Sequence, residues 1–248
     1  MGAVSAGGFD LAGHPRFELV RQVGAGASGI VYEARDRERG ARVALKTLAR
    51  MDPTALYRFK REFRSLADVV HPNLVELHEL VSDGDHWFFT MELVRGVDFL
   101  EWVAGDGGRV TDWERLRSAL VQLARGVLAL HAARKLHRDL KPSNVLVSDE
   151  GRVKVLDFGL ALDMRDDARE LMESGVLGTP AYMAPEQATA DPTADHRADL
   201  YAVGVLGFEL LTGTPPFTGT AQQLIVAHLT QPAPPLRERR SDVPQAVS

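Results

Sequence analysis

The chain contains no cysteine, and this absence excludes several kinds of protein at once. Disulfide frameworks, thiolate metal sites and cysteine nucleophiles are ruled out, and a reducing compartment, by default the cytoplasm, fits best. The chain also lacks an uninterrupted apolar run of the ~20 residues that a membrane-spanning helix needs. The longest such stretch, Tyr201–Leu211, is interrupted by Gly204, Gly207 and Glu209. The beginning of the chain lacks the basic and apolar regions of a signal peptide.

The chain has no excess of positive charge. Lys and Arg number 29 against 34 Asp and Glu, which gives a net charge of −5. Nucleic acid and anionic membranes are therefore not expected as main partners. Hydrophobic residues make up 45% of the 248 residues and charged residues 25%, a composition typical of a globular protein with its own core.

Short β-favouring runs alternate with turn residues in the first third of the chain, which predicts a small antiparallel sheet. Residues 1–16 before it are predicted to be a loosely ordered tail. A helix is predicted over Thr54–Val70, with Phe59, Phe63, Leu66 and Val70 on one face. The predicted strands are Phe17–Val23, Ile30–Ala34, Arg42–Leu48, Leu74–Leu80 and His86–Leu93.

The second half is predicted to be rich in helices. A helical apolar repeat covers Asp112–Ala133, and a second apolar helix is expected from Asp199 to Leu211, closed by Gly213. Two short strands are expected at Asn144–Val147 and Arg152–Leu156, and a polar loop at residues 163–175. The later prolines, at 232, 234 and 235, predict either a linker or a connection between two helices of one lobe.

A glycine-rich pattern, G-x-G-x-x-G-x-V, is formed by Gly24, Gly26, Gly29 and Val31 between two predicted strands. Glycine suits a phosphate-binding loop because backbone amides can approach phosphate oxygens with no Cβ between. The pattern alone also fits a flexible hairpin or a dinucleotide site. A dinucleotide site requires a helix directly after the glycines, and the run from Ile30 to Ala34 favours a strand.

A lysine and a glutamate form a second candidate pair. Lys46 ends a predicted strand of apolar residues, and Glu62 lies on the apolar face of the predicted helix. A lone lysine in this place is more often a surface residue that extends its amine to water. A buried carboxylate is costly unless a cation meets it, so the two residues together favour an ion pair that could hold phosphates.

Two carboxylates and an amide occur at a spacing that chance rarely produces. Asp139 and Asn144 lie in a loop between a helix and a strand, and Asp157 follows the next strand in Asp157-Phe158-Gly159. Each triplet by itself fits ordinary turn chemistry. Together they would gather at one edge oxygen ligands that suit Mg²⁺, and a carboxylate that can accept a proton.

These motifs, in this order, resemble the protein kinase family, and most of all its bacterial eukaryote-like Ser/Thr branch, from about Phe17 to the end of the chain. The resemblance implies an α+β, two-lobed protein-kinase-like fold. The N-lobe, residues 17–94, would be an antiparallel sheet with one helix, and the C-lobe, residues 95–248, would be mainly α-helical. It also implies transfer of the ATP γ-phosphoryl group to Ser or Thr hydroxyls of proteins, autophosphorylation included.

The resemblance also implies roles for single residues. Lys46 and Glu62 match the ion pair of the N-lobe, and Asp139 matches the base that orients the acceptor hydroxyl. Lys141 matches the lysine that contacts the γ-phosphate in Ser/Thr kinases, which argues against tyrosine specificity. Asn144 and Asp157 match the metal ligands. The residues implied in nucleotide binding are Val23, Gly24, Gly26, Gly29, Val31, Ala44, Lys46, Met91 as gatekeeper, Glu92, Val94 and Leu146.

Three further segments resemble parts of a Ser/Thr kinase. Residues 178–183 resemble the substrate-docking segment, in which Thr179 would touch the base, and Ala184-Pro185-Glu186 follows it. Asp199 is expected to fix the backbone of the catalytic loop; a plain helix N-cap is a second interpretation, and both can hold at once.

The chain departs from the family in two places. Leu171 and Glu173 stand where members of this branch often carry threonines. We expect Arg138 to meet either Glu173, as a fixed negative charge, or a phosphate on Ser174, while a merely solvated Glu173 is an equal alternative. The chain also ends before further expected helices, which would supply the partner of Glu186, so we expect a fragment of a longer protein.

Two other functions compete with an active kinase. A pseudokinase that binds nucleotide or partners as a scaffold is disfavoured because Lys46, Asp139, Asn144 and Asp157 are all present. A small-molecule phosphotransferase is disfavoured by the docking segment. The implied cofactors are ATP and Mg²⁺, with Mn²⁺ as an alternative ion, and the implied partners are Ser/Thr-containing proteins and a second kinase copy in a homodimer.

Overall fold

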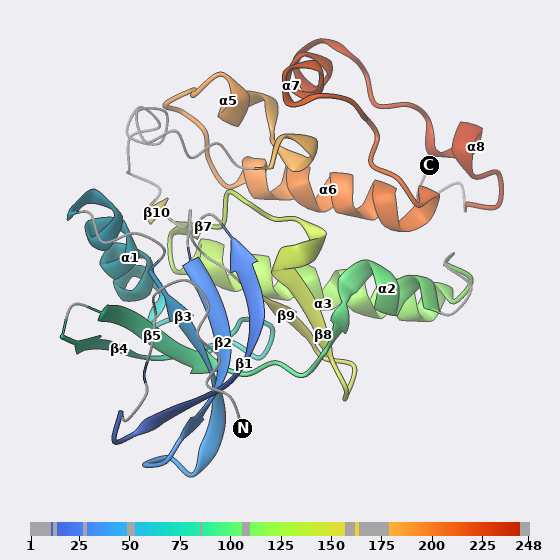
Figure 1. The fold of residues 1–248 in the computed structure, drawn as a ribbon. Helices are drawn as coiled ribbons and strands as arrows, with labels where there is room; N and C mark the ends of the chain where they lie inside the picture. The colour runs from blue at the N-terminus through green and yellow to red at the C-terminus, as the bar shows by residue number, and fades with distance from the viewer. Residues whose placement is uncertain are drawn as a thin grey trace. The chain divides into compact units, whose positions relative to one another are not determined.

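A computed structural model of the chain describes residue 11 and residues 14–26, 29–48, 53–84, 86–105, 110–156, 162–163 and 179–243. The chain divides into two compact units (Figure 1). The first comprises Met1–His71 and Val75–Arg95, and the second comprises Pro72–Leu74 and Gly96–Ser248. None of the helices in the described ranges is both long and apolar enough to span a membrane.

The first unit is built on a five-stranded antiparallel sheet with strand order β1-β2-β3-β5-β4 (Figure 1). This confirms the small antiparallel sheet predicted from the alternation of strand and turn residues. Within the described part of the unit, one helix, α1 Pro53–Leu66, lies between β3 and β4 in the sequence. The strands are β1 Phe17–Gly26, β2 Gly29–Asp36, β3 Ala41–Thr47, β4 Leu77–Asp83 and β5 His86–Glu92.

Both faces of this sheet are covered by apolar side chains. Phe88 and Phe89 are neighbours in β5, so their side chains point to opposite faces. The Phe89 ring lies 5.0 Å from that of Phe59 and 5.7 Å from that of Phe63, both in α1, which therefore covers one face. The cluster on the other face consists of Leu11, Phe17, Tyr32, Ala34, Val43, Leu45 and Phe88.

Several residues of the predicted tail make defined contacts, among them Leu11 and His14. Leu11 is 6% exposed and packs into the cluster around Phe17. His14 Nδ1 accepts the backbone N–H groups of Arg16 at 3.1 Å and Phe17 at 3.0 Å. The prediction of a loose tail over residues 1–16 is therefore wrong for Leu11 and His14, because one buries apolar surface and the other binds the start of β1.

Two predicted element boundaries are also wrong in this part of the chain. Helix α1 ends at Leu66 rather than Val70, whose side chain is 75% exposed. A β-branched pair and Pro72 follow, and proline disfavours the helical conformation of the residue before it. The strand predicted from Leu74 begins only at Leu77. Leu74 instead forms an isolated parallel bridge with Val155 in the second unit, to which both residues belong.

The second unit is mainly helical, as predicted. Its two longest helices are α3 Trp113–Ala132, capped by Asp112, and α6 Arg197–Thr212, which ends at Gly213 with φ 81°. Two small sheets, β6-β8-β9 and β10-β7, complete it. The remaining elements are α2 Phe99–Ala104, α5 Pro185–Ala188, α7 Ala221–Thr230, α8 Leu236–Arg239, the 3-10 turns η2 Pro142–Asn144 and η3 Pro180–Tyr182, and the strands β6 Gly96–Asp98, β7 Lys135–Leu136, β8 Val145–Ser148, β9 Val153–Val155 and β10 Leu162–Asp163.

The proline-rich segment near the end joins two helices of one unit. Pro232, Pro234 and Pro235 connect α7 to α8, both of which belong to the second unit (Figure 1). Arg240, 3% exposed, is the residue directly after α8; its guanidinium donates to the carbonyl oxygens of Leu211 and Val110 and holds the end of α8 against α6. Of the two alternatives drawn from the sequence, the connection between helices is confirmed.

Candidate active site

The described part of the site centres on Asp139, in the loop between β7 and η2. Its Oδ1 accepts the backbone N–H of Thr179 at 3.0 Å and the Thr179 hydroxyl at 3.2 Å. Its Oδ2 lies 2.7 Å from the Lys141 ammonium and 3.3 Å from the Asn144 amide nitrogen. Both carboxylate oxygens are therefore oriented, while the Asp139 side chain keeps 17% exposure.

Lys141 and Asn144 are held to the same aspartate. The Lys141 ammonium donates to the Thr179 hydroxyl at 2.9 Å, in addition to its ion pair with Asp139. The Asn144 amide nitrogen donates to the backbone oxygen of Asp139 at 2.8 Å. The 3-10 turn η2 begins directly after Lys141, and the Asn144 backbone N–H donates to the Lys141 carbonyl oxygen at 3.0 Å, which keeps Asn144 close to the loop. The structure thus brings together four residues that the sequence singled out, and includes the expected contact between Thr179 and Asp139.

Asp199 anchors the backbone of this loop from α6. Its carboxylate accepts the backbone N–H groups of His137 at 2.9 Å and Arg138 at 2.8 Å, and a third contact from His131 Nε2 at 2.8 Å. The side chain is 1% exposed. Burial alone would raise its pKa, but the His131 contact and the two backbone donors outweigh burial, so the pKa of Asp199 lies below its usual range.

Asp199 is not the N-cap of α6, which is His196. The expectation that it fixes the catalytic loop is confirmed, and the N-cap interpretation is wrong. Arg138, which it holds, has φ 65°, a left-handed conformation that costs a non-glycine residue about 1–2 kcal/mol. The bonds from the loop to Asp199 hold this strained backbone in place.

Two supporting residues were not found from the sequence. His131 lies at the end of α3 and reads there as an ordinary last-turn histidine. Gln187 follows Glu186 in α5, and its amide nitrogen donates to the Arg138 backbone oxygen at 2.9 Å. The only sequence signal for either is a polar residue in an apolar setting, and such residues are common.

The first unit carries the glycine-rich hairpin. Gly26 at the end of β1 pairs with Gly29 at the start of β2, and Val31 pairs with Lys46 of β3. Because a strand follows the glycines at once, the dinucleotide interpretation is excluded. Residues 27–28, at the tip between the strands, lie outside the described residues.

Lys46 is buried rather than extended to water. It is 3% exposed, and its ammonium lies 5.7 Å from the centre of the Phe89 ring. The interpretation as a surface lysine is therefore wrong. A buried ammonium is costly unless opposite charge or hydrogen-bond acceptors compensate the loss of water around it. Glu62 lies in α1, but its side chain is outside the described set, so its ion pair with Lys46 remains a prediction.

The expected nucleotide-binding residues are divided between the two units. In the first unit Ala44 pairs with Met91 across β3 and β5, Glu92 ends β5 and Val94 follows it. Val23 lies in β1 and is 40% exposed. Leu146 belongs to the second unit, in β8, where it pairs with Asp98 and Lys154. Their contacts with a nucleotide remain predictions.

Part of the expected site lies outside the described residues. Asp157, Glu173 and Ser174 belong to this part. The described ranges contain no group of three or more His, Asp or Glu side chains that could hold a metal ion. A metal ligand set of Asn144 and Asp157 was expected, and only Asn144 can be placed.

Comparison with known proteins identifies the family. The protein kinase domain model matches residues 17–245. The DNA damage-responsive serine/threonine-protein kinase RqkA of Deinococcus radiodurans is 38% identical over 253 aligned residues, which cover 96% of this chain and 36% of RqkA. The serine/threonine-protein kinase PknA of Mycobacterium tuberculosis is 37% identical over 242 residues, 92% of this chain and 54% of PknA. PrkC of Bacillus subtilis is 34% identical over 236 residues, 94% of this chain and 36% of PrkC.

The chain thus spans between about a third and about half of the length of these curated relatives. The family match covers both units, from the first residue of β1 to the end of the described chain. The fold agrees with it, because a five-stranded antiparallel sheet with one described helix precedes a mainly helical unit. This chain belongs to the protein kinase domain family.

Proposed function

We propose that the chain is the catalytic domain of a serine/threonine protein kinase, which transfers the γ-phosphoryl group of ATP to protein hydroxyls, its own included. The main support for this proposal is the Asp139 carboxylate, which Lys141, Asn144 and Thr179 hold at hydrogen-bond distance. Similarity to bacterial serine/threonine-protein kinases, at 34–38% identity, supports the same reaction.

Asp139 would accept the proton of the acceptor hydroxyl, because a fixed carboxylate within reach of the hydroxyl acts as a general base. The Lys141 ammonium, 2.7 Å from Asp139, would stabilise negative charge on the transferring phosphoryl oxygens. Thr179 binds both of these side chains and so fixes their separation. The described residues contribute mainly position and charge, which phosphoryl transfer requires.

ATP supplies the phosphoryl group, and a divalent ion neutralises charge on its phosphates. Asn144 fits a place beside such an ion, because its amide nitrogen is bound to Asp139 and its carbonyl oxygen is of the ligand type that Mg²⁺ prefers. We assign Asn144 and Asp157 to Mg²⁺, with Mn²⁺ as the alternative ion. Lys46, with Glu62 as its counter-charge, would hold the phosphates beneath the hairpin of Gly24, Gly26 and Gly29.

The test is transfer of radiolabelled phosphate from ATP to myelin basic protein, a generic basic acceptor, by the wild type and Asp139→Asn. We expect Asp139→Asn to lower kcat by about 10²- to 10⁴-fold, because the amide cannot accept the proton. Asp149→Asn makes the same chemical change in the exposed turn after β8 and should leave kcat within about twofold. A wild type that binds ATP and transfers nothing would contradict the proposal, and equal rates for both aspartate variants would remove Asp139 from the role of base.

Regulation is proposed to act through Arg138, which precedes Asp139 and whose backbone is held by Asp199. We propose that its guanidinium receives a negative charge from Glu173 or from phosphorylated Ser174. Activity lost in Glu173→Ala and kept in Ser174→Ala supports the fixed charge, and the reverse supports the phosphate. Full activity in both variants contradicts both versions.

We further propose Ser- and Thr-containing proteins as substrates, a cytoplasmic location for this domain and a homodimer that phosphorylates itself. The absence of cysteine supports a reducing compartment. Sedimentation of the purified chain, with and without ATP, tests the homodimer, and a monomer at every concentration would contradict it.

A further inference from the structure

Residues 179–182, far from Asp139 in the sequence, begin with a residue held against it. Thr179 binds Asp139 with its backbone N–H and its hydroxyl. The turn η3 follows at once, so Pro180, Ala181 and Tyr182 lie within three residues of that contact. An acceptor whose hydroxyl reaches Asp139 must therefore pass this segment, which we call the docking turn (residues 179–182).

Different elements hold the two ends of the docking turn. Thr179 is held by Asp139 and Lys141. The Tyr182 hydroxyl donates to Glu209 Oε2 of α6 at 2.6 Å. Burial raises the pKa of Tyr182, and raises that of Glu209 as well. The backbone between these ends is short, and its middle carbonyl, that of Ala181, needs a donor of its own.

A histidine of α7 supplies that donor. His228 Nε2 lies 3.2 Å from the Ala181 carbonyl oxygen, and its Nδ1 lies 2.7 Å from the Tyr201 hydroxyl. A carbonyl oxygen can only accept, so Nε2 must carry the hydrogen. Neutral imidazole then accepts at Nδ1, and the Tyr201 hydroxyl donates to it. The three residues form one directed chain from α6 through α7 to the docking turn.

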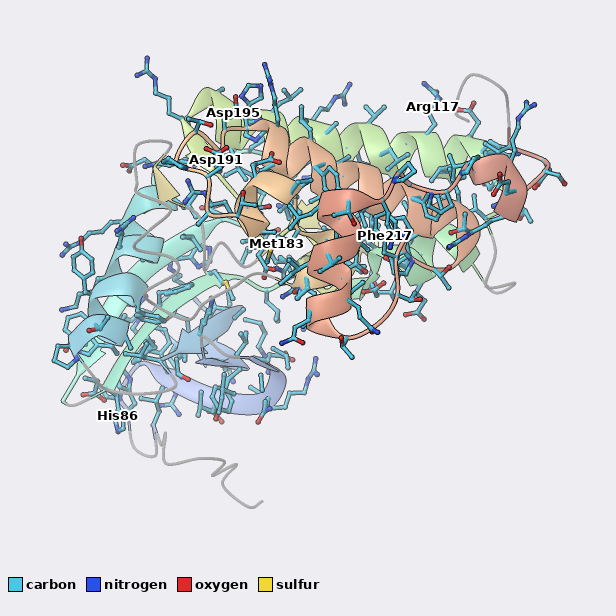
Figure 2. The ribbon with its side chains drawn as sticks, turned by 90° about the horizontal axis from the view of Figure 1, so that it is seen from above. His86, Arg117, Met183, Asp191, Asp195 and Phe217 are labelled. Carbon is cyan, nitrogen blue, oxygen red and sulfur yellow. The ribbon has the colours of Figure 1, made fainter. Side chains whose placement is uncertain are left out.

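This histidine is enclosed by apolar groups. It is 5% exposed, and the Phe217 ring meets its ring edge to face at 5.0 Å and 89°. Phe217, which is labelled in Figure 2, packs with Leu224, Ala227 and the partly buried Ala181. Burial lowers the pKa of His228 below its usual value, which keeps the imidazole neutral at physiological pH.

We propose that His228 is a positioning residue for the protein acceptor: through the Ala181 carbonyl it fixes the docking turn against which the acceptor segment lies. The inference rests on the proposed kinase function and deepens it. It gives α7 a part in acceptor binding through the docking turn rather than through Asp139 itself. These contacts end at the docking turn, so ATP would bind independently of them.

The test separates the Michaelis constants of the two substrates. His228→Leu removes both polar contacts at similar volume, and we expect KM for myelin basic protein to rise about five- to tenfold, as the loss of one or two buried hydrogen bonds predicts. KM for ATP and kcat at saturating acceptor should change less than twofold. A change confined to KM is typical of lost ground-state binding.

Three further variants make the test decisive. His228→Gln presents an amide N–H to the Ala181 carbonyl and should bring the acceptor KM back to within about twofold of the wild type. Tyr201→Phe removes only the hydroxyl that fixes the tautomer and should raise it about threefold. Gln222→Ala, on the exposed side of the same helix, should leave it unchanged. Thermal unfolding of each variant reports whether the fold is kept.

An acceptor KM in His228→Leu and Tyr201→Phe equal to that of the wild type would overturn the inference. A fall in kcat alone, or an equal loss in His228→Gln and His228→Leu, would also overturn it, because the contact with Ala181 would then not be the cause. Should His228→Leu not fold, Tyr201→Phe and His228→Gln decide alone. A wild type without transfer would contradict the kinase function itself, so that the two failures are distinguishable.

Discussion

Replacement of Asp199 by alanine tests how the catalytic loop is held. The carboxylate accepts the backbone N–H groups of His137 and Arg138 and a contact from His131. Hydrogen bonds to a charged group contribute about 1.5–3 kcal/mol each, and part of that is offset by the cost of burying the carboxylate. We expect Asp199→Ala to lower the free energy of unfolding by about 3–5 kcal/mol, the usual loss when one partner of a buried charged network is removed.

The catalytic activity of this variant should also fall. Arg138 sits at φ 65°, and without Asp199 the loop can relax to the right-handed conformation that is favoured by about 1–2 kcal/mol. Asp139, the next residue, would then leave its position against Thr179 and Lys141. A displacement of about 1 Å at a reacting group can lower the rate by about 10²-fold, and we expect a loss of that order in phosphate transfer to myelin basic protein.

The assay is urea unfolding of the purified chain, with hydrogen exchange at the His137 and Arg138 amides. An unchanged m-value would show that the midpoint reports stability. Asp195→Ala is the matched control, because the Asp195 side chain is 40% exposed. Among the described residues, its carboxylate accepts one hydrogen bond, from the Arg197 backbone N–H at 2.9 Å. This variant should lose less than about 1 kcal/mol. The reasoning is refuted if Asp199→Ala unfolds within about 0.5 kcal/mol of the wild type with unaltered amide exchange.

Three other changes have definite expected outcomes. Gly96→Ala would place a Cβ 1.9 Å from the Val147 backbone oxygen, so urea unfolding should show a loss of about 3 kcal/mol or more. Thr90→Val should gain about 1 kcal/mol in the same assay, because the buried Thr90 hydroxyl has no hydrogen-bond partner among the described residues; a loss would contradict this. The hydrogen bond from the Arg16 guanidinium lowers the pKa of the buried Asp36 to about 2, against about 3.9 in the unfolded chain. The ionised Asp36 therefore stabilises the fold above about pH 4, and this contribution is lost as the pH falls towards 2. Asp36→Asn should lack that part of the pH dependence of unfolding, and parallel curves for the two proteins would refute it.

Local chemistry explains why much of the fold was predictable. The alternation in β1 to β3 and the apolar repeat of α3 depend on residues close in sequence, and both were predicted to within a few positions. The errors lie where distant packing decides. Val70 continues the apolar spacing of α1, but it lies beyond the end of the helix and is 75% exposed. Leu74 pairs with Val155, 81 positions away, instead of extending β4.

The sequence by itself determined the chemical groups of the site. Asp139, Lys141 and Asn144 lie within six residues of one another, and together with Asp157 and the glycine-rich pattern they carried the resemblance that implies phosphoryl transfer. It could not find His131 or Gln187, because each acts through a backbone or carboxylate partner on another element.

Only the tertiary structure decided how these groups are held. Asp199 is 60 residues from Asp139, and His228 is 47 from Ala181, so no local pattern connects them. Both contact backbone groups: Asp199 accepts from N–H groups, and His228 contacts a carbonyl oxygen. Every residue type except proline carries both groups, so the sequence leaves no mark at the positions that are held. Asp199 was predicted only through the resemblance to a family, and the contact of His228 became visible only when folding placed its ring within about 3 Å of the Ala181 carbonyl oxygen.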